Sequence, residues 1–432
     1  MAQNRSAPIV IYFLLGLLSV DIYGNSGSDY WPVWRGPDGT GTASKGNPPL
    51  TWSETENIKW KTKLPGKGFS SPVVWGDKVF FQTSIKTDKK VTDSDLGDAA
   101  YVHKFDVVCV DRGTGKILWQ RTAREEKPHE KHGRGNSFAS YSPVTDGKYV
   151  WAGFGSHGLH CYDVDGNGKW SVDLGRMKTD DEIGGASSPV LAGQAVIVVM
   201  DHMADSTITA VNKETGKIIW RKGRDEETGW ATPVAAEVNG KLQVITSSDN
   251  RVRSYDVKTG EVIWECEGQT MNAIPTPVAG FGKVYCTSGF QGNILQAIEL
   301  GRTGDLTGID AISWEIKKNT PYISSPVLVG DKIYFCYGRR AAVSCYEAET
   351  GKVVFERQKL EGLKDIYASP VAAKDRIYFV GRDGKTAVIK HSKKFETLAV
   401  NTLDDKFDAS PAIAGDEIFL KGKTYLYCIA KP

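Results

Sequence analysis

Short apolar runs alternate with turn residues along most of this chain, a pattern typical of strands rather than helices. One complete unit runs from residue 187 to residue 223 and reads SSPVLAGQAVIVVMDHMADSTITAVNKETGKIIWRKG. Its first apolar run begins at Pro189, the next two are AVIVVM and STITAVN, and the fourth follows a Thr-Gly turn and ends at Trp220. Four such runs separated by turn signals predict a four-stranded antiparallel meander.

The unit recurs along the chain, and a Ser/Thr-Pro pair marks the start of each copy. From Ser142 onward the pairs lie 41 to 49 residues apart, which matches the length of a four-stranded propeller blade. The first two pairs are 71 residues apart, so the first unit contains an insertion. The pairs begin at Ser71, Ser142, Ser188, Thr232, Thr276, Ser325, Ser369 and Ser410. Eight units predict an all-β fold, an eight-bladed β-propeller of four-stranded antiparallel blades.

The turn and the aromatic residue that end a unit are repeated too. TGKILW at 114–119, TGKIIW at 215–220, TGEVIW at 259–264 and TGKVVF at 350–355 are nearly the same sequence. We expect each ring to lie across the gap to the next blade, while the turn glycine adopts the positive φ that a tight hairpin needs. The predicted structural docking aromatics are Trp60, Trp119, Trp170, Trp220, Trp264, Trp314 and Phe355. The seventh unit, HSKKFETLAVN, has neither the turn nor the aromatic residue.

The eighth unit stops after TYLYCIA and therefore lacks a fourth strand. The segment NIKWKTKLPG at 57–66 has the character of the missing strand, with Trp60 in the aromatic position. We predict that this N-terminal strand completes the last blade, because closing the ring removes two exposed sheet edges.

The N-terminus resembles a secretory signal. Arg5 precedes the apolar stretch PIVIYFLLGLLSV at 8–20, and a polar, small-residue segment follows it. The stretch is shorter than the roughly 18 residues that normally span a bilayer, although an uncleaved anchor is an alternative. The sequence thus predicts a signal peptide at 1–24, an N-terminal segment at 25–56 and a propeller at 57–432. The mature chain is expected in the periplasm or cell envelope, without a transmembrane domain.

Charge and cysteine content exclude several classes of function. The 54 basic and 52 acidic residues nearly balance, so a nucleic-acid partner is not expected. The seven cysteines are odd in number and form no CxxC motif, which argues against a metal, haem or redox site. Cys109, Cys161, Cys345 and Cys428 occupy one repeated strand position, where a small buried side chain is required.

The Thr-Gly-x-x-x-Trp turns, with VVCVDRGTGKILW and VIWECEG among them, resemble the tryptophan-docking repeats of the pyrrolo-quinoline quinone (PQQ)-like eight-bladed β-propellers. WPVWRGPDGTG at 31–41 and HGLHCYDVDGNGKW at 157–170 are similar to exported bacterial members of that family. One branch, the quinoprotein alcohol dehydrogenases, uses the cofactor. Another, the outer-membrane assembly protein BamB, has the propeller without the cofactor and works as a protein-binding scaffold.

The resemblance implies specific features for the dehydrogenase branch: long insertions, a vicinal cysteine pair, a catalytic Asp, and calcium held by oxygen ligands. No two cysteines are adjacent here, and little chain remains beyond eight minimal blades. We therefore expect a binding or scaffold protein of the cell envelope, without a bound cofactor, whose partner is another protein or an envelope component. The alternative is a PQQ-dependent quinoprotein oxidoreductase acting on alcohols or sugars, with PQQ and calcium.

Candidate binding residues lie in irregular stretches that we expect at a mouth of the channel. REEKPHEKHGRGNSFASYSP at 124–143 carries His132, Arg134 and Asn136 and leads to Tyr141. These groups suit an anionic ligand or a substrate carbonyl; a solvated polar hairpin is the plain alternative.

Two further sets complete the candidates for the channel mouth. Asp201 and His202 follow a strand in MDHMADS, where they suit a general base or simply form a polar turn. Trp230, Tyr322 and Tyr367 precede inner-strand prolines, where they rim the channel as a platform for a ligand or pack its inner edge. No catalytic residue and no metal ligand is assigned.

Overall fold

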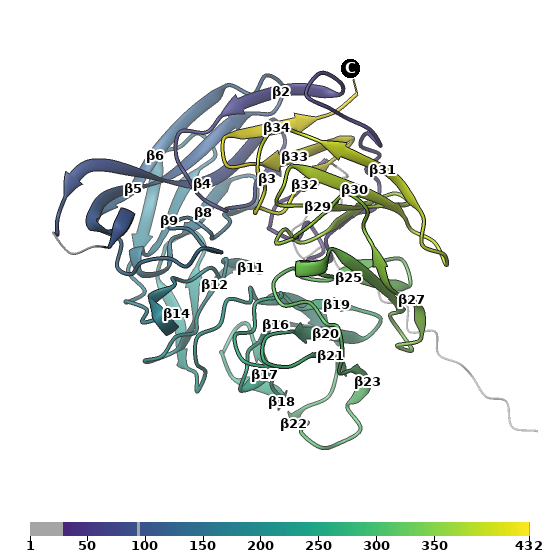
Figure 1. The fold of residues 1–432 in the computed structure, drawn as a ribbon. Coiled ribbons are helices and arrows are strands. Elements are labelled where there is room, and N and C mark those ends of the chain that lie inside the picture. The colour runs from purple at the N-terminus through teal and green to yellow at the C-terminus, as the bar shows by residue number, and fades with distance from the viewer. Residues whose placement is uncertain (1–28, 93–95, 432) are drawn as a thin grey trace, which may run out of the picture.

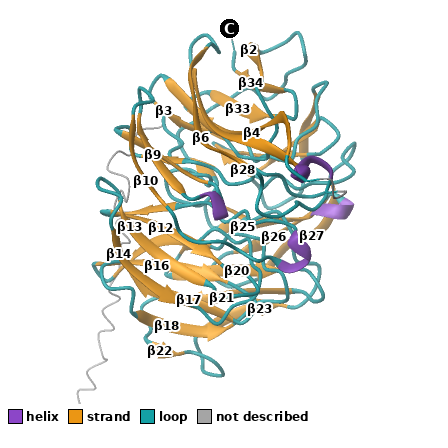
Figure 2. Ribbon diagram, turned by 90° about the vertical axis from the view of Figure 1, so that its left-hand side faces the viewer, coloured by secondary structure: helices purple, strands orange, loops and turns teal. Residues whose placement is uncertain are grey.

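The computed structural model describes residues 29–92 and 96–431. These residues form eight sheets, which Figure 1 shows arranged as blades in a ring. The predicted all-β, eight-bladed propeller is confirmed. The predicted signal peptide at 1–24 lies outside the described residues. Loops join the strands on both faces of the ring, and the helices are short (Figure 2).

Each of the first four blades is built from consecutive strands, as the meander pattern predicts. Blade 1 consists of β3 (Val73–Trp75), β4 (Lys78–Lys90), β5 (Tyr101–Asp111) and β6 (Ile117–Glu126). Blade 2 consists of β7 (Val144–Thr145), β8 (Tyr149–Gly153), β9 (Leu159–Asp163) and β10 (Gly168–Val172). Blade 3 consists of β11 (Val190–Ala192), β12 (Ala195–Met200), β13 (Thr207–Asn212) and β14 (Ile218–Gly223). Blade 4 consists of β15 (Val234–Val238), β16 (Lys241–Ser247), β17 (Arg251–Asp256) and β18 (Val262–Glu267).

The other four blades repeat the plan. Blade 5 consists of β19 (Val278–Gly280), β20 (Lys283–Ser288), β21 (Ile294–Glu299) and β23 (Ile312–Ile316). Blade 6 consists of β24 (Val327–Val329), β25 (Lys332–Tyr337), β26 (Ala342–Glu347) and β27 (Val353–Lys359). Blade 7 consists of β28 (Val371–Ala373), β29 (Arg376–Val380), β30 (Lys385–Lys390) and β31 (Thr397–Thr402). Blade 8 consists of β32 (Ala412–Ala414), β33 (Glu417–Lys421), β34 (Tyr425–Ile429) and the N-terminal β2 (Ile58–Lys63).

The N-terminal strand closes the ring as predicted. β2 pairs antiparallel with β34, with Trp60 opposite Cys428, and the two strands lie side by side in Figure 1. Two sheets gain a fifth strand: β1 (Thr42–Ala43) runs parallel to β28, and β22 (Gly304–Asp305) runs parallel to β18. The predicted insertion in the first unit lengthens the β4–β5–β6 meander.

Short 3-10 helices lie within the segments that connect strands: η1 (Gly97–Ala100), η2 (Gly155–His157), η3 (Asp180–Glu182) and η4 (Gly338–Arg340). Among the residues that the structure describes, none of the helices has the length and apolar character needed to cross a membrane.

Outer-strand tryptophans contact the turn of the next blade. Trp220 Nε1 donates a hydrogen bond to the Val257 carbonyl at 2.9 Å. The turn glycine Gly260 has a φ of +73°, and a Cβ placed on it would lie 2.6 Å from the Trp220 ring. Ala210 sits opposite Trp220 in the sheet, and Cys109 is likewise opposite Trp119. The small side chain, the indole and the glycine therefore form one packing unit between blades, where a buried aromatic ring contributes most of the contact area.

The same contact recurs with local variations. Trp60, Trp119, Trp170 and Trp314 each donate a hydrogen bond from Nε1 to a carbonyl of the following blade. Trp264 is fully buried, with Leu306 of the β22 insertion in the same core cluster, and its Nε1 has no hydrogen-bond partner among the described residues. Phe355 packs edge-on against Phe395.

Blade 7, whose own sequence lacks the docking aromatic, receives one from the N-terminal segment. Trp52 stacks on Tyr378 of β29, with ring centroids 6.2 Å apart. Its backbone N–H donates to Asn401 Oδ1 of the outer strand β31 at 2.9 Å. In blades 5 and 6 the corresponding tyrosines, Tyr285 and Tyr334, contact their own blades' aromatics, Trp314 and Phe355. Trp52 thus supplies the contact that the seventh unit does not encode.

Candidate functional site

The eight Ser/Thr residues of the repeat markers form a closed ring of hydrogen bonds around the channel. Each backbone N–H donates to the side-chain hydroxyl of the corresponding residue in the next blade, at 2.8 to 3.2 Å. The eight bonds run from Ser71 to Ser142, Ser188, Thr232, Thr276, Ser325, Ser369, Ser410 and back to Ser71. All eight residues are buried.

This ring explains why a hydroxyl residue and a proline recur together. The proline that starts the innermost strand has no N–H, and the N–H before it is buried at the channel, where it requires an acceptor. The hydroxyl of the neighbouring blade provides that acceptor. A hydroxyl that accepts one N–H keeps its own O–H as a donor, so the ring presents donors to the channel.

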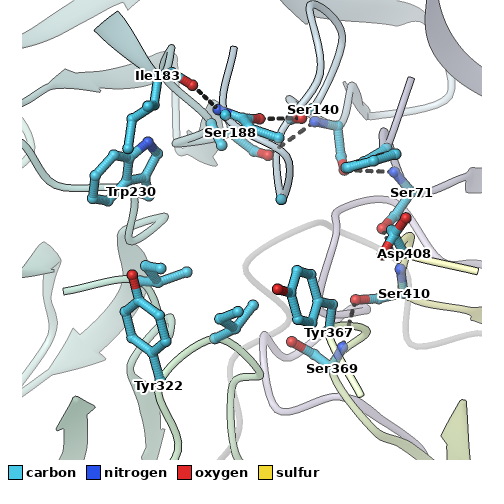
Figure 3. A pocket seen from close by; sticks show the side chains of 18 of the residues that line it. Ser71, Ser140, Ile183, Ser188, Trp230, Tyr322, Tyr367, Ser369, Asp408 and Ser410 are labelled. Atoms are coloured by element: carbon cyan, nitrogen blue, oxygen red, sulfur yellow. Dashed lines mark hydrogen bonds between the residues drawn. The ribbon is translucent and has the colours of Figure 1, made fainter. Parts of the chain in front are cut away.

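A cavity of about 380 Å³ opens at this ring. Five of the ring serines line it: Ser71, Ser142, Ser188, Ser369 and Ser410. Figure 3 shows four of them, Ser71, Ser188, Ser369 and Ser410, with the aromatic side chains placed around the hollow. Three predicted channel-mouth aromatics, Trp230, Tyr322 and Tyr367, line the cavity, and so do Arg134 and Asn136. We call it the mouth cavity.

The aromatic walls are held in place by their neighbours. Trp230 Nε1 donates to the Gly184 carbonyl at 2.7 Å. Tyr322 stacks on Phe290, with centroids 4.9 Å apart, and the Arg382 guanidinium lies over the Tyr367 ring at 3.8 Å. These contacts restrict the orientation of the three rings, so each ring presents one face to the mouth cavity.

The insertion of blade 1 contributes one side of the mouth cavity. Asn136 Nδ2 donates to the carbonyls of Ile183 and Gly184, and its Oδ1 accepts from the backbone N–H of Ser137. A Cβ on Gly135 would lie 3.1 Å from the Tyr367 ring, so the loop reaches across the mouth to that side chain. Asn136 thus positions the loop, while the neighbouring Arg134 remains exposed at the rim.

The N-terminal segment crosses the end of the channel beneath the mouth cavity. Its backbone pairs with Val74 of blade 1 through Trp31, and with Leu328 and Ala372 of blades 6 and 7 through Thr40 and Gly41. Between these points Trp34 lines the mouth cavity.

Positive charge is concentrated around the mouth cavity. Arg35 is buried and donates to the carbonyls of Pro370 at 3.0 Å and Pro326 at 2.9 Å. Burial lowers the pKa of its guanidinium to about 9, so it stays cationic at neutral pH. Arg134 and Arg339 line the rim, and neither forms a hydrogen bond or ion pair with another described residue.

Asp408 is the one carboxylate among the described residues that line the mouth cavity. It pairs with Arg382 Nε at 2.6 Å and with Lys423 at 3.5 Å. Arg382 also contacts Asp365 at 3.3 Å. The negative charge of Asp408 is therefore balanced by Arg382 and Lys423. Arg134 and Arg339 have no carboxylate partner among the described residues.

The other four predicted mouth residues lie away from the mouth cavity. His132 is exposed and packs edge-on against Phe138. Tyr141 is buried, and its hydroxyl contacts Met177 Sδ at 3.6 Å; burial raises its pKa. Both line a separate small cavity of about 40 Å³.

Asp201 and His202 belong to the packing between blades 3 and 4. Asp201 accepts from Arg224 Nε at 2.7 Å and from Ser248 Oγ at 2.8 Å, while Arg224 also donates to Tyr255. His202 is buried, and desolvation lowers its pKa. A carboxylate fixed in this buried ion pair lies outside the mouth cavity, so the general-base interpretation has no support in its surroundings.

Sequence reasoning missed Trp34, Arg35, Arg339 and Asp408. Arg35 stands in the quoted segment WPVWRGPDGTG, where an arginine among glycines and aromatics was a usable signal. Arg339 and Asp408 carried none, because Arg339 lies in the short helix η4 and Asp408 in a loop, and neither segment belongs to the repeated pattern.

The residues around the mouth cavity do not fit calcium-dependent PQQ chemistry. Calcium takes 6–8 oxygen ligands, usually with several carboxylates, whereas Asp408 is already paired with Arg382. The described ranges contain no group of three His, Cys, Asp or Glu side chains that could hold a metal ion. All seven cysteines are buried and unpaired.

Comparison with known proteins gives a consistent picture of family and fold. The family model described as outer membrane protein assembly factor BamB matches residues 103–356 and 302–394. No sequence among the curated proteins matches this chain. The crystal structure of BamB from Moraxella catarrhalis is similar, with a TM-score of 0.58, 14% identity, and coverage of 86% of this chain and 96% of that one.

Two other solved structures share the fold. Quinohemoprotein alcohol dehydrogenase from Comamonas testosteroni has a TM-score of 0.51 and 12% identity, covering 95% of this chain and 82% of that one. The computationally designed Ika8 protein has a TM-score of 0.55 and 13% identity, covering 85% of this chain and 98% of that one. At these identities the likeness concerns the fold alone.

Proposed function

This chain belongs to the PQQ-repeat propeller family described as outer membrane protein assembly factor BamB, and from that premise we propose that it is an exported binding scaffold of the cell envelope. It recruits a protein partner through the channel mouth and works without a bound redox cofactor. The family description supports the envelope location, and the apolar stretch at 8–20 supports export.

The observation that carries this proposal is the mouth cavity. Fixed aromatic faces, hydroxyl donors and two uncompensated arginines meet in a space of about 380 Å³, a size and lining typical of a binding site. Its carboxylate, Asp408, is ion-paired with Arg382 and Lys423, and its Oδ2 accepts no hydrogen bond from a described residue. The aromatic, hydroxyl and guanidinium groups of the lining support the binding of a ligand.

A PQQ-dependent oxidoreductase is the second candidate. The aromatic and arginine lining that suits a protein ligand would also suit a planar anion such as PQQ. Against it stands the lack of a suitable carboxylate set for calcium among the described residues.

Site-specific photo-crosslinking in the cell envelope tests the scaffold proposal. The photo-reactive residue p-benzoylphenylalanine replaces Ile274 or Ile323, which line the mouth cavity, and in a matched control it replaces Val353, an exposed side chain on the outer strand of blade 6. We expect discrete protein adducts from the two mouth positions and not from Val353. Absence of adducts at both mouth positions in a folded, exported protein would contradict the proposal.

A further inference from the structure

The mouth cavity offers several free hydrogen-bond donors, while its free acceptors are the remaining lone pairs of the same hydroxyls and Asp408 Oδ2, which accepts no hydrogen bond from a described residue. The five ring serines that line it already accept a backbone N–H, and each retains an O–H. Tyr322 and Tyr367 add phenolic hydroxyls, and no hydrogen bond joins these to another described residue. Asn136 Nδ2 donates to the carbonyls of Ile183 and Gly184, so its amide hydrogens are not available to a ligand. A ligand rich in acceptors is therefore complementary to this lining.

The positive charge of nearby arginines favours an anion over a neutral acceptor-rich ligand. Arg134 and Arg339 stand at the rim without a carboxylate partner in the described part of the chain. Arg35 places a buried cation beside the ring, bonded to neutral carbonyls of Pro326 and Pro370. An anion entering the mouth cavity is therefore attracted by Arg134 and Arg339, which line it; Arg35 lines a separate small cavity and contributes only a more distant positive charge.

The shape of the mouth cavity selects the end of a chain. Trp34 and the crossing N-terminal segment close the channel beneath the ring, so a passing strand has no exit on that side. A volume of about 380 Å³ lies at the small end of the range for ligand pockets, about 300–1,000 Å³. Such a space admits a terminal residue and its neighbour but no folded domain.

From these features we propose that the mouth cavity captures the free C-terminal carboxylate of a partner protein whose last side chain is aromatic or large and apolar. The carboxylate accepts hydrogen bonds from the ring serines and faces the arginines, while the last side chain packs against Trp230 and Tyr322. C-terminal carboxylate capture is a recurring mode of peptide recognition. The inference rests on the proposed scaffold function and specifies its partner.

The test uses two matched series of fluorescein-labelled pentapeptides, Gly-Ser-Gly-Ser-X, with each of the twenty residues at X. One series ends in a free carboxylate and the other in an amide. Fluorescence anisotropy measures binding to the mature protein. We expect the tightest binding from carboxylate peptides ending in Phe, Tyr, Trp or Leu, and a roughly ten-fold or larger loss on amidation, because a hydrogen-bonded charge is removed. The proposal is overturned if no carboxylate peptide binds more tightly than its amide.

Variants locate the binding. R134Q and R339Q should each weaken the best peptide roughly three- to ten-fold, since both arginines lie at a solvated rim. R340Q is the matched control, because Arg340 is the exposed neighbour of Arg339 in η4 and does not line the mouth cavity. Equal effects of R339Q and R340Q would overturn the assignment of the site. Thermal melts establish that all three variants fold.

A competition experiment distinguishes a peptide ligand from an acidic sugar. An acidic oligosaccharide of galacturonate units is added to the peptide complex; displacement by it together with no preference for carboxylate peptides would assign the mouth cavity to a sugar and overturn the inference. If mouth crosslinks to protein persist while every peptide fails, this inference is wrong and the scaffold proposal stands. If the crosslinks fail too, both are wrong.

Discussion

Removing a single hydroxyl from the Ser/Thr ring tests whether that ring holds neighbouring blades together. Ser325 is fully buried and does not line the mouth cavity. Its hydroxyl accepts the Thr276 N–H at 2.9 Å. Ser325→Ala leaves that buried N–H without a partner, which costs about 1–3 kcal/mol. Ser324→Ala is the control, because the adjacent Ser324 hydroxyl is also buried but only donates to the Cys336 carbonyl at 3.3 Å.

The expected shift follows from the size of the chain. With 432 residues and roughly 2.1 cal/mol/K of unfolding entropy per residue, the total is roughly 0.9 kcal/mol/K. Ser325→Ala should therefore lower the melting temperature by roughly 1–3 °C, and the urea midpoint should fall with an unchanged slope. Ser324→Ala should lie closer to the wild type. If the two variants are equally stable, the ring does not contribute as argued.

Two other predictions concern a docking turn and a buried histidine. Gly260→Ala places a methyl group against the Trp220 ring, whereas Gly240, with the same φ of +73°, has open space around it; both share the backbone strain, so G260A should be less stable than G240A by about 1–3 kcal/mol in urea unfolding, and equal losses would refute the docking role. Desolvation lowers the pKa of buried His103 below its ordinary value of 6.5. Between the two pKa values the unfolded chain therefore binds more protons than the folded protein, so the free energy of unfolding decreases as pH falls from about 6.5 towards the folded pKa. The melting temperature should drop less between pH 7 and pH 5 in H103Q than in the wild type, and parallel profiles would contradict this.

Repeated local patterns made the architecture predictable. The Ser/Thr-Pro pair recurs once per blade and the Thr-Gly turn in four of the units, so the other copies show the pattern where one unit departs from it. The chain closure was also accessible, because an eighth unit that ends after TYLYCIA needs a strand and 57–66 supplies one. What the repeats did not predict is Trp52 in blade 7, since its contact with Tyr378 joins residues far apart in the chain.

The mouth cavity was predictable only in part. Trp230, Tyr322 and Tyr367 were found because each stands three or four residues before the proline that opens an inner strand, and all three line the mouth cavity. Asp201 resembled a candidate base in sequence, but its counter-ion Arg224 lies 23 residues away in a different strand-end loop. Charge pairing of this kind depends on tertiary contacts that no local pattern encodes. The same holds for Arg339, whose position at the rim follows from η4.

A titration with PQQ and calcium tests most directly the central claim that this propeller binds a partner without a redox cofactor. The melting temperature and absorbance of the mature protein are followed as PQQ is added. A ligand at 100 times its dissociation constant stabilises the fold by about 2.7 kcal/mol, which is roughly 3 °C for a chain of this size. The account predicts no saturable shift; a shift that saturates at one equivalent of PQQ and depends on calcium would contradict it.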